Sequence, residues 1–213
     1  MELDVTIEIP KGSRVKYEID HETGRIRLDR VLFTSMGYPE HYGYFEDTLG
    51  EDGDPLDAMV LLDVDIMPGV IVEARPVAVF NMNDEAGGDA KILCVSTDKR
   101  YDHIQGLDDI MDFKQKEIQH FFERYKDLEP NKWVKGEGWS GKDEAERLVR
   151  EAQERFEASH YDSAAEAVHN GALWRPGHWP RRPSRREAGP VLLLREPDVG
   201  RRRPLCCRCA VVA

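Results

Sequence analysis

The sequence predicts a mainly β protein with some α structure (α+β), built as a small barrel or sandwich with helices packed outside. Three observations support this prediction. Strand-like segments, of which some alternate between apolar and polar residues and others are longer apolar runs, dominate the first 100 of the 213 residues. Apolar side chains at helical spacing follow between residues 108 and 159. Beyond residue 160 that periodicity ends, so we expect one folded domain over residues 1–160 and a separate tail over residues 161–213.

The first three expected strands come from alternation with a period of two residues. Val5–Ile9 and Val15–Ile19 flank a turn at Pro10–Ser13. Arg25–Arg30 alternates in the same way after a second turn at residues 20–24. We interpret these segments as a meander.

Longer apolar runs predict further strands at residues 58–66, 70–80 and 92–95. Pro68-Gly69 and a Gly-rich stretch at residues 83–88 separate them. Several short strands joined by regular turns are typical of a barrel or a sandwich.

Two helices are expected after the strands. Apolar side chains on one helical face predict the first, over residues 108–125, through Ile118, Phe121, Phe122 and Tyr125. Ser140–Asp143 has the spacing of a capping box and predicts a second helix that ends near Ser159.

The net charge of −11 hides two oppositely charged parts. Residues 175–213 hold ten Arg and three acids, which leaves residues 1–174 with a net charge of −18. A body of that charge repels bare phosphate chains, which argues against nucleic acid as its ligand. A bound cation would reverse this for a small phosphate compound.

The tail differs from the body in composition. Residues 161–213 contain no Lys, Ile or Met, and Arg and Pro are frequent, so we expect this stretch to be disordered. Its Arg-for-Lys bias also suggests translation of a shifted reading frame. Cys206, Cys207 and Cys209 lie near its end with a spacing that matches no ordinary zinc site.

Three features predict a cytoplasmic protein without a membrane span. No apolar run approaches the ~18–20 residues that a membrane helix needs. Met1–Asp4 is acidic, unlike an export signal, and the lone Cys94 of the body fits a reducing compartment.

An acidic motif carries the strongest chemical signal. Residues 31–74 contain ten acids and neither Lys nor Arg, and Asp52-Gly53-Asp54-Pro55-Leu56-Asp57 lies at their centre. Crowded carboxylates need a cationic partner, and a hard divalent ion with oxygen ligands would serve. A solvated acidic loop is the alternative. The motif fits neither the EF-hand pattern nor the haloacid-type phosphatases, whose Asp pair follows a strand.

Other charged residues indicate a metal or phosphate site only when they are considered together with this motif. Asp84–Lys91 places carboxylates in a Gly-rich turn, which alone is best interpreted as a hairpin loop. Lys16 and Glu18 share one face of a strand. Arg30 ends another strand, and Lys126 follows the first helix.

The Asp52–Asp57 motif resembles the signature of the soluble inorganic pyrophosphatases, the Mg-dependent family I enzymes. Further matches run in order through residues 1–160 and are most similar to actinobacterial members. They include Glu8–Ser13, Lys16–Glu18, Leu28–Arg30, Met36–Pro39, Tyr42-Gly43, Asp84…Lys91 and His120…Glu129. The tail resembles nothing in the family.

This resemblance implies a role for each matching residue. Asp54 would be the general base. The implied metal ligands are Asp52, Asp57, Asp84, Asp89, Glu18 and Glu8, and the implied substrate-binding residues are Lys16, Arg30, Tyr42, Lys91, Tyr125 and Lys126.

The resemblance also implies the reaction, fold and assembly. A water activated by Mg²⁺ would attack pyrophosphate in line, without a phosphoenzyme. Several Mg²⁺ ions would bind per site, Mn²⁺ or Zn²⁺ would substitute, and Ca²⁺ would inhibit. The implied fold is a five-stranded barrel of OB type, in a homohexamer. An OB-type nucleic-acid binder and a calcium-binding module without catalysis are the alternatives, and the charge of the body disfavours the first.

Overall fold

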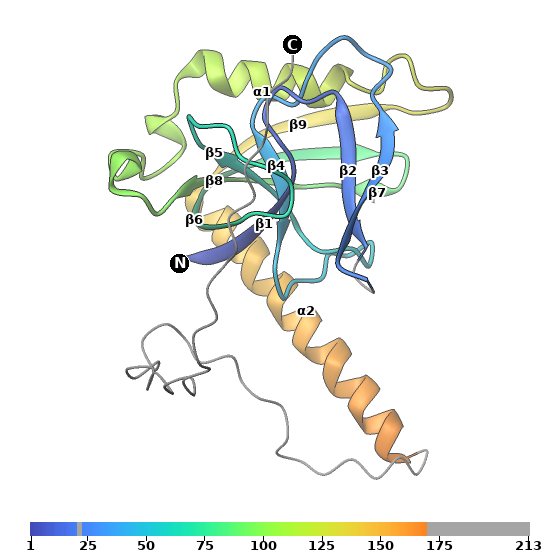
Figure 1. Ribbon diagram of the computed structural model, residues 1–213. Helices are drawn as coiled ribbons and strands as arrows, with labels where there is room; N and C mark the ends of the chain where they lie inside the picture. Colours follow the sequence, from blue (N-terminus) through green and yellow to red (C-terminus); the bar gives the residue numbers. More distant parts are fainter. Residues whose placement is uncertain (21–22, 170–213) are drawn as a thin grey trace, which may run out of the picture. The chain divides into compact units, whose positions relative to one another are not determined.

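The structure is a computed structural model that describes residues 1–20 and 23–169, with side chains described up to residue 160. Strands dominate its first half, and two α-helices lie in the second (Figure 1). The strands are β1 (Leu3–Ile9), β2 (Val15–Asp20), β3 (Arg25–Val31), β4 (His41–Phe45), β5 (Asp57–Leu61), β6 (Ile71–Asp84), β7 (Gly87–Gly88), β8 (Lys91–Ser96) and β9 (Val134–Gly141). The helices are the short 3₁₀ turns at Lys99–Tyr101 and Leu107–Asp109, α1 (Asp112–Arg124) and α2 (Lys142–His169).

Five of these strands close into a ring. β1 pairs with β4, β4 with β5, β5 with β8, β8 with β6, and β6 returns to β1. Each pairing is antiparallel except that of β5 with β8, which is parallel. β7 and β9 add to β6 outside the ring. The five-stranded, OB-like barrel that the resemblance implied is therefore confirmed.

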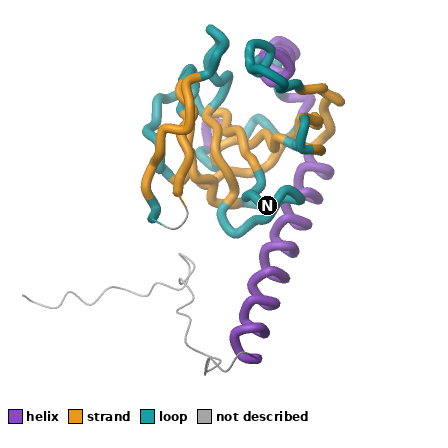
Figure 2. Tube along the Cα trace, turned by 90° about the vertical axis from the view of Figure 1, so that its right-hand side faces the viewer, coloured by secondary structure: helices purple, strands orange, loops and turns teal. Residues whose placement is uncertain are grey.

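The core fills the ring and the space between it and the helices. Val5, Ile7 and Val79 are fully buried. Phe122 on α1 stacks near Phe80 of β6, with ring centroids 6.3 Å apart. Helix α2 packs against β6 and β9 through buried residues on one face, Ala145, Val149 and Ala152. Figure 2 shows α2 running along one side of the strands.

The predicted meander is only partly correct. β2 and β3 form the predicted hairpin, as a separate two-stranded sheet. β1, however, pairs with β4 and β6 and not with β2. The reason lies in the intervening turn: Gly12 N–H donates to the Tyr38 carbonyl (2.8 Å) and Tyr38 N–H to the Ser13 carbonyl (2.9 Å). This pairing directs the chain away from β1.

Three strands were missing from the sequence prediction: β4, the two-residue β7 and β9. All five residues of β4 are buried, so the strand has no apolar–polar alternation. The segment that forms β9, Val134–Gly141, contains three glycines, which are depleted in strands. Close pairing explains one glycine of β4, because a Cβ on Gly43 would lie 1.8 Å from the Thr6 carbonyl oxygen.

Both predicted helices are present, with shifted boundaries. α1 begins at Asp112, four residues later than predicted, after a 3₁₀ turn. Ser140 lies within β9 and its hydroxyl accepts a hydrogen bond from the Asn81 amide (2.9 Å), so the predicted capping box is wrong. α2 continues to His169, which also corrects the prediction that disorder begins at residue 161. Residues 161–169 include three Ala and neither Gly nor Pro, so propensity favours helix there.

Some predictions lie outside the described residues: the disorder of the tail beyond residue 169 and the cysteines at 206, 207 and 209. Cys94 is buried on β8 as a free thiol. Among the described helices, none combines the length and apolarity needed to cross a membrane.

Candidate active site

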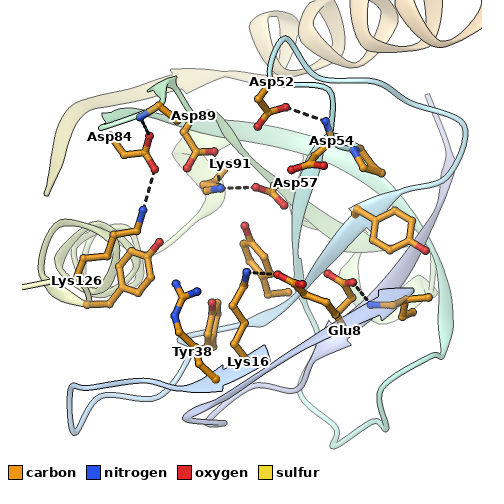
Figure 3. A pocket seen from close by; sticks show the side chains of 18 of the residues that line it. Glu8, Lys16, Tyr38, Asp52, Asp54, Asp57, Asp84, Asp89, Lys91 and Lys126 are labelled. Carbon is orange, nitrogen blue, oxygen red and sulfur yellow. Dashed lines mark hydrogen bonds and ion pairs between the residues drawn. The ribbon is translucent and has the colours of Figure 1, made fainter. Parts of the chain in front are cut away.

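A cavity of about 380 Å³ opens between the hairpin β2–β3, the aspartate-rich loops and the end of α1. All thirteen residues that the resemblance marked line this one cavity. They are Glu8, Lys16, Glu18, Arg30, Tyr42, Asp52, Asp54, Asp57, Asp84, Asp89, Lys91, Tyr125 and Lys126. Figure 3 shows the labelled aspartates along one side, facing Lys16 and Glu8 across the cavity.

The loop before β5 carries the central aspartates. Gly53 adopts a left-handed conformation (φ 93°), which glycine tolerates best, as its predicted role in a tight turn requires. The Asp54 N–H donates to the Asp52 carboxylate (3.1 Å), and the Gly50 N–H donates to the Asp54 carbonyl (2.6 Å). Asp52 and Asp54 are exposed to the cavity, and Asp57 is half-buried at the start of β5.

Lys91 is the cation at the centre of the aspartates. Its side chain comes from β8, is almost fully buried, and donates to the carboxylates of Asp57 and Asp89. Burial lowers the pKa of Lys91, but the charges of Asp57 and Asp89 outweigh it, and the pKa lies above its ordinary value. Burial raises the pKa of Asp89 although Lys91 opposes this.

A second lysine pairs with the other acidic cluster. Lys126 follows α1 and donates to the Asp84 carboxylate (2.8 Å). Its neighbour Tyr125 stacks on Phe121, with ring centroids 5.2 Å apart, which fixes this segment to the core. Residues 31–74 contain no base, which favoured a metal ion as the partner of the central aspartates. In the structure Lys91 already pairs with Asp57 from 34 residues away, and Lys126 pairs with Asp84 from 42 residues away.

The hairpin β2–β3 supplies the opposite wall. Lys16 donates to Glu18 (2.6 Å), which confirms that the two side chains share a strand face. Burial lowers the pKa of Lys16, but the hydrogen bond and charge of Glu18 leave it above its ordinary value. Arg30 donates to Asp29 (2.9 Å).

Glu8 is the buried carboxyl group of this wall. One of its oxygens accepts a hydrogen bond from the Ile19 N–H (2.7 Å), and burial raises its pKa to about 7. Because the folded protein holds this proton more tightly than the unfolded chain, its stability should fall as pH rises from about 4.5 through about 7.

We therefore expect Glu8→Gln to stabilise the protein above pH 8 in the presence of a chelator. The gain should be about 1 to 3 kcal/mol and should vanish below pH 4.5, where wild-type Glu8 is protonated in both states. Urea denaturation at several pH values measures this. Glu2→Gln, at an exposed position just before β1, is the control, and an equal gain there would contradict the assignment.

Tyr38 and Tyr44 also line the cavity but were not predicted as site residues. Tyr38 packs between Tyr42 (5.2 Å) and Phe121 (4.9 Å). Tyr44 follows Tyr42 by two residues in β4 and shares its face, so recognition of this strand would have indicated Tyr44.

The donor set suits a hard divalent cation, because the acidic side offers only carboxylate oxygens. Among the described residues, however, no three acidic, His or Cys side chains converge closely enough to hold one ion as they stand. The ammonium group of Lys91 lies between Asp57 and Asp89. A metal ion at these two carboxylates would therefore compete with Lys91 for them.

Comparison with known proteins identifies the family. The family model described as inorganic pyrophosphatase matches residues 5–157. The inorganic pyrophosphatase of Corynebacterium glutamicum is 59% identical over 158 residues, covering 74% of this chain and all of the relative. That of Streptomyces coelicolor is 60% identical over 157 residues, covering 73% of this chain and 96% of the relative.

A solved structure agrees with these relatives. The crystal structure of the inorganic pyrophosphatase from Thermus thermophilus superposes with a TM-score of 0.71 at 47% identity, covering 73% of this chain and 91% of that one. The resemblance drawn from the motifs, including that to actinobacterial members, is confirmed. The chain belongs to the inorganic pyrophosphatase family.

Proposed function

We propose that this protein hydrolyses inorganic pyrophosphate to two orthophosphates, with Mg²⁺ as its cofactor. The observation that supports the proposal most is the convergence of all thirteen motif residues on one cavity. The labelled aspartates lie along one side with Lys91 and Lys126 beside them, and Lys16 lies opposite, so that both carboxylates and cations face the space that a metal–phosphate substrate would fill.

Membership of the family implies a divalent metal cofactor. We assign its ligands to Asp52, Asp57, Asp84, Asp89, Glu18 and Glu8. A bound divalent ion offsets the charge of pyrophosphate and lowers the pKa of a coordinated water. We expect several Mg²⁺ ions per site, activity with Mn²⁺ or Zn²⁺, and inhibition by Ca²⁺.

The other site residues would bind the substrate and accept the proton of the attacking water. Lys16, Arg30 and Lys126 would bind phosphate oxygens and offset the charge that builds on the leaving phosphate. Tyr42, Lys91 and Tyr125 complete the substrate-binding set. Asp54 would accept the proton of the attacking water as the water oxygen bonds to one phosphorus and the bridging P–O bond breaks.

Asp54→Asn tests the base role. We expect kcat to fall about 100- to 10,000-fold, the usual contribution of a general base, and the pH–rate profile to shift. Metal affinity, measured by calorimetry, should change far less than in the matched variant Asp52→Asn. An unchanged pH–rate profile would contradict a base role for Asp54.

Phosphate release from pyrophosphate tests the function as a whole. The full chain should release phosphate with Mg²⁺, lose the activity in EDTA, and be inhibited by Ca²⁺. A calcium-binding module would bind Ca²⁺ without releasing phosphate, and a nucleic-acid binder would shift an oligonucleotide in a gel. Either result without phosphate release would reject the proposal.

We also propose a cytoplasmic homohexamer with a catalytic domain in residues 1–160. Large apolar side chains exposed on and after β3, at Leu28, Val31 and Phe33, support self-association. Sedimentation of the full chain measures the assembly. A variant that ends at His169, which retains the whole of α2, shows whether the tail affects it.

A further inference from the structure

Arg30 lies next to an irregularity in the hairpin that changes where side chains point. Lys16 pairs with Arg30, but the next residue of β2, Tyr17, pairs with Leu28. Asp29 is therefore an extra residue, a β-bulge, which re-aims neighbouring side chains. As a result Asp29 contacts both cations: its Oδ2 accepts from Arg30 Nη1 (2.9 Å) and lies 3.5 Å from Lys16 Nζ.

A second acid approaches Arg30 from another part of the fold. Glu129 follows α1, and its Oε1 lies 3.6 Å from Arg30 Nε. Its side chain is only 8% exposed. Within the described part of the chain, neither of these two atoms has a hydrogen-bond partner. A buried carboxylate is costly unless a cation pairs with it, so the position of Arg30 and that of Glu129 depend on each other.

The backbone holds Glu129 firmly. Its N–H donates to the Lys126 carbonyl (2.9 Å), and its own carbonyl accepts from the Lys132 N–H (3.4 Å). Glu129 therefore connects the segment that carries Tyr125 and Lys126 with the hairpin that carries Arg30. Both segments line the cavity.

The guanidinium of Arg30 has three nitrogens to place. Nη1 donates to Asp29 and Nε faces Glu129, and the Arg30 side chain lines the cavity. We propose that Glu129 is a positioning residue that orients Arg30 toward a substrate phosphate. This inference rests on the proposed function, because it requires Arg30 to bind a substrate phosphate. Glu129 itself would have no contact with substrate and would act through Arg30 alone.

A double-mutant cycle on the full chain tests the inference. In the wild-type background, Glu129→Gln should lower kcat/KM for Mg-pyrophosphate about 10- to 100-fold and raise KM, as expected when a binding group is displaced. In an Arg30→Ala background the same change should have an effect of less than about twofold, since Glu129 then has nothing to orient. A purely structural role would give the same loss in both backgrounds.

Two further variants keep the result interpretable. Asp127→Asn lies in the same turn, at an exposed position paired with Arg124, and should retain wild-type kinetics. Glu129→Met removes the charge of Glu129 while it keeps the side-chain volume. It takes the place of Glu129→Gln in the cycle if Glu129→Gln does not fold. Equal losses in both Arg30 backgrounds, or wild-type kinetics in both Glu129 variants, would overturn the inference. A wild-type protein without phosphate release would instead reject the proposed function.

Discussion

Asp57→Asn should lower kcat for pyrophosphate hydrolysis by at least about 1,000-fold while the protein stays folded. Each tenfold loss corresponds to about 1.4 kcal/mol of transition-state stabilisation, and a ligand that places a catalytic metal supplies several kcal/mol. Asp57 lines the cavity and shares Lys91 with Asp89. The amide has nearly the same shape, and Lys91 keeps Asp89 as its partner, so the fold should persist.

The loop offers a matched control for this variant. Glu51 lies in the same acidic segment but is exposed and does not line the site cavity. Glu51→Gln removes one negative charge without touching the site, and we expect its kcat to remain within about twofold, as for surface substitutions in general. Phosphate release and circular dichroism, measured on both variants, separate catalysis from folding. Near-normal hydrolysis by Asp57→Asn would show that its assignment is wrong.

The sequence predicted those parts of the fold that depend on local pattern. Alternation of apolar and polar residues identified β2 and β3 and the turn between them, although neither strand has a fully buried residue. Closure of the ring could not be predicted in this way, since it depends on pairing between β1 and β6, about 65 residues apart in the chain. β4 was not predicted, because it is buried on both faces and its sequence therefore does not alternate.

The candidate site likewise combines features that local sequence shows with features that only the fold produces. The aspartate motif is local, and the family resemblance identified the remaining positions. Local pattern could not show that cations already lie among the acids. Lys91 is 34 residues from Asp57, and Lys126 is 42 residues from Asp84, and only the fold brings each pair together. Glu129 likewise approaches Arg30 from 99 residues away only because the hairpin packs beside the end of α1.

Lys91→Met should destabilise the protein by about 3 kcal/mol in the presence of a chelator. Removal of one partner from a buried ion pair leaves the other charge without compensation, and such changes typically cost about 3 to 5 kcal/mol. Here two carboxylates, Asp57 and Asp89, would lose their shared ammonium. We take the lower end because both carboxylates keep some access to solvent through the cavity. Urea denaturation in EDTA measures the loss.

Mg²⁺ should then restore part of this stability, and more in Lys91→Met than in the wild-type protein. In the wild type an incoming ion must first draw Asp57 and Asp89 from Lys91, whereas in the variant both carboxylates are free to bind it. Lys132→Met is the control, because Lys132 pairs with Glu85 at an exposed position, where a lost ion pair costs at most about 1 kcal/mol.

The contribution of Lys91 to the free energy of unfolding should also depend on pH. Since the pKa of Lys91 lies above its ordinary value, this contribution should stay constant from pH 7 to 9 and be lost only at higher pH. Equal stability of the two lysine variants in EDTA would show that Lys91 does not hold the aspartates together, and the metal would then bind without competition from the protein's own cation.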